Sequence, residues 1–439
     1  MGDNMLQAQK HTRFDWYRDI QVLQKYIYIY TRLFGMGTVD DIYALGEWIN
    51  THHDGIMYSG KRCIIAAPES PREVARLDGS GVFNKAWVDD MLTSISLVDG
   101  GIVGSSGEAW ELYRHVTGFD HSNHHLHITA WFNQKKYDQV GSRLKHRLLP
   151  LIESGEIQKP RNAYQFSKRI TFMLLIEEVF EYYELTDEQL DELASAVMDL
   201  LNKAVIKQNV KIFPSQSYID KLRSVVESYF DKIILSQSKD ANNLASRIKL
   251  ALENSTINKD QAVGLFIQLI VAGHDTTAAG LVWGLYSMAT RYNEVPPIHG
   301  IPVEELVKKD SPAMRWINDY LNRHPSSPLM FRQTTRDCSI VINGQEYQVE
   351  KGTTVVFLIP TILRNNDTPY LASFSKGIRM CVGFPMALLE QLTFFDLLQE
   401  YQLKPVFDGR VIEKSSGGIN VPTGQGIRNF YFESLNGKS

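Results

Sequence analysis

The longest continuous hydrophobic pattern in the chain runs from Asn258 to Thr290, where apolar residues occupy nearly every side of a helical wheel. A helix that is apolar all round has to lie in the interior of a protein. Asn258 is followed three residues later by Gln261, an arrangement like a capping box, in which each side chain bonds the other residue's backbone N–H. The pattern therefore predicts a long buried helix that begins just after Asn258.

Shorter patterns near the N-terminus predict a helix and two strands. Residues 40–50 have a helical pattern, and residues 55–60 and 62–66 are short apolar runs closed by Pro68. The following stretch, 78–107, is rich in Gly and Ser with weak periodicity, and long irregular segments of this kind often have a function. We expect a small N-terminal sheet followed by an irregular segment.

The remaining patterns are helical first and strand-like later. Several amphipathic helices are predicted between residues 161 and 236. Residues 338–349 form two alternating runs around Asn343-Gly344, which is the strongest short signal for a hairpin. A strand is expected at 353–359, and a hairpin region ends the chain. The predicted fold class is mainly α with small β-sheets.

Composition and charge exclude several classes of function. Of the 439 residues, 44% are hydrophobic and 22% are charged, and no flexible linker divides them, so we expect a single domain over residues 1–439. A formal net charge of −4 offers no surface for nucleic acid. The three cysteines show no disulfide or zinc spacing, and the apolar run near residue 26 is too short to span a membrane. We expect a cytoplasmic protein with no membrane anchor and no nucleic-acid partner.

One cysteine lies in a loop between two glycines. The fixed positions of this loop are Phe374, Gly377, Arg379, Cys381 and Gly383. Both glycines can adopt positive φ and let a flat ring lie against the backbone. A helix is predicted directly after the loop, over residues 385–402, and Pro385, which opens it, suits a first turn, whose positive end favours a nearby anion. The loop therefore presents its cysteine as a thiolate.

The spacing Phe-x-x-Gly-x-Arg-x-Cys-x-Gly resembles the heme-binding signature of the cytochrome P450 superfamily. The resemblance implies a cytochrome P450 fold in which Cys381 ligates the iron of heme b (iron protoporphyrin IX). Such a thiolate favours O–O cleavage on the opposite face of the heme. Arg379 would neutralise a heme propionate, because a guanidinium matches a carboxylate. A buried structural cysteine in a Gly turn is the alternative, and the other motifs argue against it.

The predicted buried helix contains an acid and an alcohol at its centre. An ionisable aspartate such as Asp275 costs free energy there unless it is paired or functional. The P450 family has a matching motif. It implies that Ala272 and Gly273 leave space above the iron, that Thr276 hydrogen-bonds oxygen or water there, and that Asp275 helps to relay protons. Thr276 can also bond back to the Ala272 carbonyl and bend the helix. His274 points about 100° away from Asp275 and is expected to have a packing role.

The resemblance also suggests anchors for the heme propionates. Family members carry a His-x-x-x-Arg run on the helix before the pocket, and His121 and His125 fall on those positions, on one helix face. A solvated helix face explains the two histidines equally well, and no carboxylate or cysteine spacing supports a metal site there. Arg332, ahead of the hairpin, would supply another propionate contact. Trp110 and Arg114 have the same spacing but lie too early in the chain, so they are assigned to packing and to the surface.

Two features that are usual in the family are altered. Family members carry Glu-x-x-Arg ahead of a Pro-rich turn, and here Asp319 and Asn322 stand at those positions, with Arg323 one residue late. The ion pair is therefore either missing or rebuilt. The long meander that usually precedes the cysteine loop is also reduced, to residues 365–373. An arginine whose partners had gone would be an unpaired charge in a packed region, so the two losses are consistent with each other.

The resemblance implies a monooxygenase that uses dioxygen to oxidise a small organic substrate, by hydroxylation, epoxidation or oxidative coupling, in the biosynthesis of a natural product. Electrons would come from NAD(P)H by way of a reductase and a ferredoxin or flavodoxin-type partner. One alternative is a peroxide-using or rearranging enzyme, against which Asp275 and Thr276 argue. Another is a heme-binding protein without turnover, suggested by the altered Asp319 and Asn322 region. The sequence does not identify the substrate.

Overall fold

The structure is a computed structural model. It describes residues 39–58, 61–67, 70–85, 101–118, 133–210, 215–238, 243–364, 372–375, 377–416 and 419–435. The chain forms two compact units, each built from segments far apart in the sequence. The first unit comprises Met1–Trp87, Ser327–Met380 and Glu413–Val421, and the second comprises Val88–Ser326, Cys381–Ile412 and Pro422–Ser439. The single domain expected from the sequence stays a prediction.

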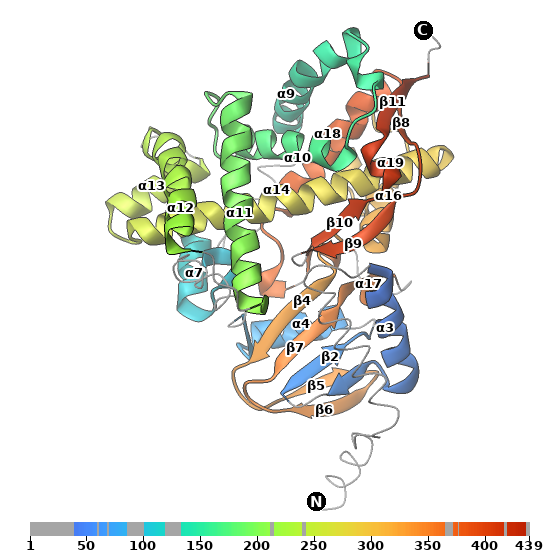
Figure 1. Cartoon of the computed structure of the whole chain (residues 1–439). Helices are drawn as coiled ribbons and strands as arrows, with labels where there is room; N and C mark the ends of the chain where they lie inside the picture. The colour runs from blue at the N-terminus through green and yellow to red at the C-terminus, as the bar shows by residue number, and fades with distance from the viewer. Residues whose placement is uncertain are drawn as a thin grey trace, which may run out of the picture. The chain divides into compact units, whose positions relative to one another are not determined.

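The first unit is built on a five-stranded sheet with the strand order β1-β2-β7-β4-β3 (Figure 1). Its strands are β1 (Ile56–Tyr58), β2 (Arg62–Ile65), β3 (Phe83–Asn84), β4 (Leu329–Thr334) and β7 (Thr354–Leu358). Strand β2 runs parallel to β7, and the other neighbours are antiparallel. The two predicted N-terminal strands and the strand predicted at 353–359 are therefore confirmed as parts of one sheet.

Helices cover both faces of this sheet, because the strand residues alternate between the faces. On β2, Ile64 packs in a cluster with residues of α3 (Val39–His52), whereas Cys63 and Ile65 pack in a cluster with residues of α4 (Ser70–Gly79). Helix α3 confirms the helix predicted at 40–50. The short helix α17 (Ile359–Leu363) follows β7 and packs on α3.

The predicted hairpin is also present in the first unit. Strands β5 (Cys338–Ile342) and β6 (Gln345–Val349) pair in antiparallel register, with Ile342 opposite Gln345. Asn343 and Gly344 form the turn with φ of 52° and 74°, the left-handed geometry that two-residue hairpin loops require. The Asn-Gly signal was therefore sufficient to fix the position of the turn.

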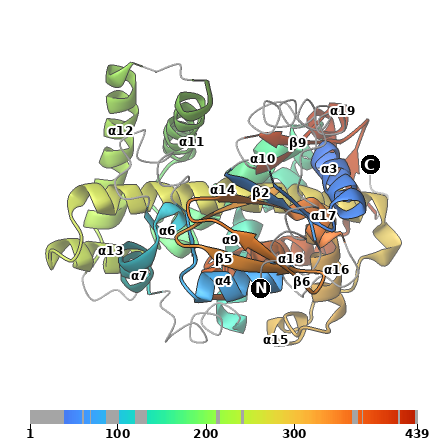
Figure 2. The ribbon, with the colours of Figure 1, turned by 90° about the horizontal axis from the view of Figure 1, so that it is seen from below.

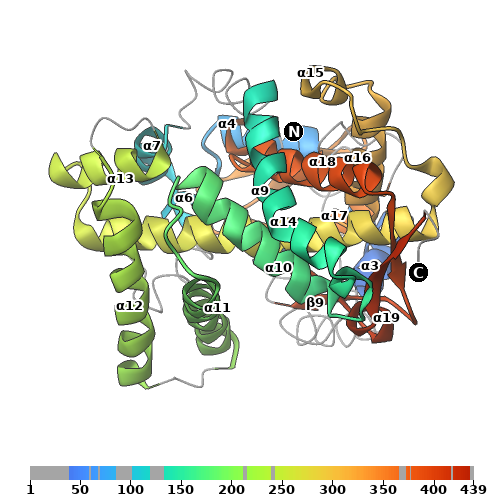
Figure 3. The same cartoon turned by 90° about the horizontal axis from the view of Figure 1, so that it is seen from above.

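The second unit is mainly helical. Its central helix is α14 (Lys259–Thr290), against which α10 (Ala163–Leu174) and α18 (Phe384–Glu400) pack, while α9 (Gln134–Glu153) packs on α18 (Figure 3). Within the described residues, the other α-helices of this unit are α6 (Gly101–Gly104), α7 (Gly107–Val116), α11 (Asp187–Val210), α12 (Gln216–Phe230), α13 (Leu244–Glu253), α15 (Val303–Leu306), α16 (Pro312–Arg323) and α19 (Gln425–Arg428). Helices α11 and α12 lie side by side (Figure 2). Two pairs of strands complete the fold, β8 (Leu403–Phe407) with β11 (Phe430–Ser434) and β9 (Ile412–Ser416) with β10 (Ile419–Thr423).

Helix α14 begins as the sequence predicts. Its N-cap Asn258 accepts a hydrogen bond from the Gln261 backbone N–H at 2.8 Å, and Gln261 Oε1 accepts one from the Asn258 N–H at 3.0 Å. The helix is long and apolar enough to cross a membrane, but 72% of its most hydrophobic window is buried within the protein. A core helix has these properties, which confirms the predicted interior position.

Candidate functional site

Cys381 is exposed and lies just before the first turn of α18. The N-cap of this 17-residue helix is Gly383, which has no side chain that could cap the first turn. A Cβ at Gly383 would lie 3.9 Å from the Cys381 sulfur, which places the sulfur beside the helix end. The positive end of a helix favours a negative charge nearby. None of the three cysteines, all of which the structure describes, forms a disulfide, so Cys381 is suited to act as a thiolate ligand.

The two glycines of the cysteine loop have different roles. Gly377 has φ of 71°, as predicted, and a Cβ there would lie 2.9 Å from the Ala75 Cβ, so the glycine lets the loop lie against α4. Gly383 has φ of −85°, which any residue can adopt, so the prediction of positive φ is wrong at this position. Phe374 and Arg379 are both partly buried, in the short 3-10 turns Ala372–Phe374 and Gly377–Arg379. The boundary between the two units falls between Met380 and Cys381.

Helix α14 has one face that is less buried than the rest. Between Ala262 and Leu285 only five of its residues are not fully buried: Leu269, Val271, Ala272, Gly273 and Thr276. Four of these, all except Val271, follow the spacing of a single helical face. Thr276 Oγ1 donates a hydrogen bond to the Ala272 carbonyl at 2.6 Å, which confirms the predicted back-bond. Of the residues predicted to handle oxygen, Ala272, Gly273 and Thr276 therefore lie on the accessible face, whereas Asp275 is buried.

Gly273 has a packing role in the structure. A Cβ at this position would lie 3.1 Å from Leu175 Cδ1, and all of the nearest atoms belong to the same leucine. Leu175 opens the π-helical turn Leu175–Val179 that continues α10. The missing side chain of Gly273 brings α14 close to the end of α10, and the role expected for Gly273 above the iron stays a prediction.

Asp275 is buried and paired. Its Oδ1 atom lies 2.8 Å from Lys168 Nζ on α10, and its side chain is only 5% exposed. Tyr164, on the same helix, has a pKa raised well above its ordinary value, by burial and then by the Asp275 carboxylate. The sequence predicted that a buried acid here would be paired or functional, and the structure shows the pair. Lys168 was missed, because nothing in a single sequence shows which carboxylate a lysine on another helix will contact.

His274 packs in the core, as predicted. It is 1% exposed, and its ring makes an edge-to-face contact with Phe172 at 5.0 Å between ring centroids. Burial lowers its pKa to about 4, which outweighs the opposing influence of Asp275. The imidazole is therefore neutral at physiological pH.

Arg332 is buried and already has a carboxylate partner. Its Nε and Nη2 atoms donate to the two oxygens of Asp78 at 2.8 and 2.9 Å, and Nη1 donates to the Phe331 carbonyl at 2.9 Å. The ion pair joins β4 to α4 within the first unit. The propionate contact expected for Arg332 stays a prediction. His121 and His125 lie outside the described residues.

Arg114 is a candidate that the sequence analysis misplaced. It was assigned to the surface, but it is 3% exposed, and its guanidinium lies 5.3 Å from the ring centroid of Trp110. A buried guanidinium is costly unless an anion or a hydrogen-bond network compensates it. The Trp-x-x-x-Arg spacing on a predicted helix was the signal that could have identified it.

The altered Glu-x-x-Arg region contains a rebuilt ion pair. Asp319 accepts hydrogen bonds from Arg291 at 2.7 Å and from Arg323 at 2.9 Å. Burial alone would raise the pKa of Asp319, but the two guanidinium groups outweigh it and hold the pKa below its usual value. Of the two alternatives that the sequence left open, a missing pair and a rebuilt pair, the structure shows the second.

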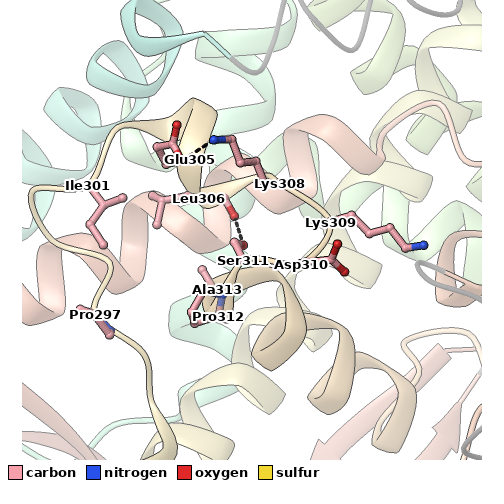
Figure 4. Close-up of a pocket in the computed structure, with 10 residues that line it drawn as sticks. All are labelled: Pro297, Ile301, Glu305, Leu306, Lys308, Lys309, Asp310, Ser311, Pro312 and Ala313. Carbon is pink, nitrogen blue, oxygen red and sulfur yellow. Dashed lines mark hydrogen bonds and ion pairs between the residues drawn. The ribbon is translucent and has the colours of Figure 1, made fainter.

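A surface hollow of about 430 Å³ lies between α15 and the start of α16 (Figure 4). Apolar side chains such as Ile301 and Leu306 line it, and Lys308 is paired with Glu305 at its edge (Figure 4). None of the candidate site residues contributes to its walls. The hollow is therefore separate from the candidate site.

Comparison with known proteins agrees with the helical fold and its motifs. The sequence profile of the Cytochrome P450 family matches residues 57–295. The match covers α14 with its acid and alcohol, and it ends before Arg332 and the cysteine loop. The assignment of the cysteine loop therefore depends on its own sequence signature and geometry.

Curated relatives match about half of the chain. Cytochrome P450 52-M1 of Starmerella bombicola is 27% identical over 274 residues, which cover 50% of this chain and 51% of the relative. Human cytochrome P450 4F12 is 25% identical over 258 residues, which cover 50% of this chain and 46% of the relative. The chain spans about half the length of the curated relatives that it matches.

Solved structures show the same fold. CalO2 superposes with a TM-score of 0.65 at 12% identity, over 91% of this chain and 97% of CalO2. The cytochrome P450DA heme domain superposes with a TM-score of 0.65 at 16% identity, over 91% of this chain and 94% of that domain. The predicted fold class, mainly α with small sheets, is confirmed. Because the family profile covers more than half of the sequence and the fold agrees, the chain belongs to the cytochrome P450 family.

Proposed function

We propose that this protein is a heme-thiolate monooxygenase in which Cys381 is the ligand of the heme iron. Members of the family bind heme through a cysteine thiolate. The observation that carries the proposal is the position of Cys381, an exposed residue whose sulfur lies beside the start of α18, where the N-cap Gly383 has no side chain. Such a position suits an anionic sulfur ligand. Bound heme b would supply the iron at which dioxygen is activated.

The residues of α14 would control protons and water at the reacting oxygen. The Thr276 hydroxyl donates to the Ala272 carbonyl, so its oxygen can accept a further hydrogen bond from a water molecule on the accessible face. Thr276 would thereby hold a proton donor near the oxygen. Asp275 is paired with Lys168 and would take part in the proton supply when that ion pair opens.

Positive side chains would bind the two heme carboxylates. Arg379 is in the cysteine loop itself, and Arg114 offers a guanidinium that the fold already buries. Either side chain can form charge-assisted hydrogen bonds with a carboxylate. Arg332 is the weaker candidate, because three of its N–H groups are bonded within the protein.

The finer parts of the function are also proposals. The substrate would be a small organic molecule that is hydroxylated, epoxidised or oxidatively coupled in the biosynthesis of a natural product. The sequence contains no complete dinucleotide-binding glycine pattern, which supports an electron donor on another protein, a ferredoxin or flavodoxin-type partner with an NAD(P)H reductase. A cytoplasmic location without a membrane anchor stays a prediction.

A peroxide-using enzyme is the second candidate, and one observation favours it. Lys168 holds the Asp275 carboxylate, so the acid is not free to deliver protons to reduced oxygen unless the pair opens. Turnover with hydrogen peroxide alone, compared with turnover driven by a surrogate reductase, separates the two. Equal rates would favour the peroxide-using enzyme.

The central claim is tested by the absorption spectrum of the heme-loaded protein. The wild type is expected to give a ferrous CO difference band of the thiolate type, and Cys381→Ser is expected to lose it. Cys338→Ser is the matched control, because Cys338 is not fully buried either but lies in the β5–β6 hairpin. An unchanged spectrum in Cys381→Ser would falsify the assignment of the ligand.

A further inference from the structure

Gln268 of α14 has a buried amide that is only half satisfied. The residue is 2% exposed, and its Oε1 atom accepts a hydrogen bond from the Val103 backbone N–H at 2.9 Å. Its Nε2 atom is buried and has no hydrogen-bond partner within the part of the chain that the structure describes. Buried polar atoms in folded proteins almost always have a partner, so an unpaired one needs an explanation. Here the atom is a donor, and it lacks an acceptor.

The orientation of this amide is fixed by α6. The Val103 N–H can donate only to an oxygen, so Oε1 has to face Val103 and Nε2 has to point away from it. Gly101 has φ of 49°, and a Cβ there would lie 2.5 Å from the Gln268 amide atoms, so the backbone of α6 lies directly against the side chain. The amide therefore cannot rotate to satisfy Nε2 without giving up the bond to Val103.

Gln268 lies on the side of α14 that carries the oxygen-handling residues. Gln268, Ala272 and Thr276 are spaced at i, i+4 and i+8, which puts them on one side of the helix. The rise of an α-helix separates Gln268 from Thr276 by about 12 Å along the axis. The unpaired donor is therefore about two turns from the position at which the proposed chemistry takes place.

We propose that Gln268 determines substrate specificity, by donating a hydrogen bond from Nε2 to an oxygen acceptor of the substrate. The substrate class is an extended organic molecule with a ketone, ester, amide or carboxylate oxygen about 12 Å from the carbon that is oxidised. The proposal rests on the proposed monooxygenase function, because Thr276 marks the reacting end of the site. The bond to Val103 gives Gln268 a second role, which is to position α6.

Two variants of Gln268 separate substrate recognition from the positioning of α6. Gln268→Glu keeps an oxygen acceptor for the Val103 N–H and removes the Nε2 donor. Gln268→Leu removes both groups. Thr290→Val is the control, because Thr290 lies at the far end of α14, where its hydroxyl bonds the Tyr286 carbonyl at 2.8 Å.

The experiment is a spectral titration of the heme-loaded full chain with two probes of equal length, 2-dodecanone and n-dodecane. Dividing one dissociation constant by the other cancels the contribution of general hydrophobic binding, which the two probes share. We expect Gln268→Glu and Gln268→Leu to weaken the binding of the ketone relative to the alkane by roughly fivefold, which is the effect of one lost hydrogen bond. Thr290→Val should leave the ratio unchanged.

The possible outcomes are distinct. A ratio that is the same in the wild type and in Gln268→Glu overturns the recognition role. A purely structural role predicts that Gln268→Leu lowers the melting temperature and weakens both probes equally, while Gln268→Glu behaves as the wild type, and this result also overturns the proposal. A wild type without the thiolate-type CO band contradicts the proposed function and this inference together, whereas a normal band with an unchanged ratio contradicts the inference alone.

Discussion

Lys168 of α10 and Asp275 of α14 form an ion pair inside the second unit, with 2.8 Å between Nζ and Oδ1. The Asp275 side chain is 5% exposed and the Lys168 side chain 19%. A carboxylate that is buried this deeply needs a compensating charge, and Lys168 supplies it. The pair therefore connects α14, whose residues we propose to handle oxygen, to its main neighbour in the helical core.

Replacing Lys168 should show how much an unpaired Asp275 carboxylate destabilises the folded protein. We expect Lys168→Met to lower the free energy of unfolding by about 3 kcal/mol, because the substitution leaves an uncompensated charge in the interior. The double variant Lys168→Met/Asp275→Asn should recover part of this loss. Urea unfolding of the purified protein measures all three free energies.

Arg169→Met is the control for this experiment. Arg169 is the next residue on α10 and pairs with Asp187 at 2.9 Å, but its side chain is 54% exposed. An exposed pair contributes about 0–1 kcal/mol. Equal losses in Lys168→Met and Arg169→Met would show that the Lys168 pair has no special role.

Local signals in the sequence were sufficient for several elements. Asn258 and Gln261 defined the start of α14, because a capping box depends only on residues within one turn. Asn343-Gly344 defined the β5–β6 turn, because few residue pairs tolerate two successive left-handed conformations. The back-bond of Thr276 was predictable for the same reason, since its acceptor is one turn away on the same helix.

The sequence was insufficient where contacts between distant segments decide the outcome. Gly273 and Leu175 are on different helices, so the packing role of the glycine is visible only once α10 and α14 are in contact. Arg114 was assigned to the surface because it lies too early in the chain for the family's His-x-x-x-Arg run. The sequence also did not identify Arg291 as the partner of Asp319, because these two residues come into contact only in the folded protein.

Thr276→Ala should uncouple oxygen consumption from product formation. The substitution removes the hydroxyl that we propose holds a water molecule near the reacting oxygen, and the loss of one positioned proton donor typically costs 10²–10⁴-fold in rate. We expect oxygen uptake to continue while hydrogen peroxide replaces product. Oxygen electrode and peroxide assays on the reductase-coupled protein measure the ratio.

The control for this variant is Thr276→Ser, which keeps the hydroxyl and should keep most of the coupling. If Thr276→Ala remains fully coupled, Thr276 has no part in proton delivery.

His274 should make the protein less stable in mild acid. Burial lowers its pKa to about 4 in the folded state, whereas an unfolded histidine titrates near ~6.5. Below about pH 6.5 the unfolded chain therefore binds a proton that the folded chain does not, and stability falls until the pH reaches about 4. The full effect of this shift is about 3 kcal/mol.

The measurement is urea unfolding at several pH values between about 7 and about 4. His274→Gln should flatten the decline, because glutamine does not titrate. His299→Gln is the control, since His299 is 52% exposed and pairs with Asp396 at the surface. A decline of equal size in the wild type and in His274→Gln would assign the acid sensitivity to other groups.

Arg114→Leu should weaken the retention of heme. Arg114 is 3% exposed, so folding has already removed its guanidinium from water. A heme carboxylate would therefore interact with a positive charge that water does not screen. We expect the variant to lose heme to a scavenging apoprotein at least about tenfold faster than the wild type, which corresponds to about 1.4 kcal/mol. The rate is read from the Soret absorbance of the scavenger. Arg315→Leu is the control because Arg315 is exposed on α16. If both variants lose heme at the same rate, Arg114 only packs against Trp110 and does not bind heme.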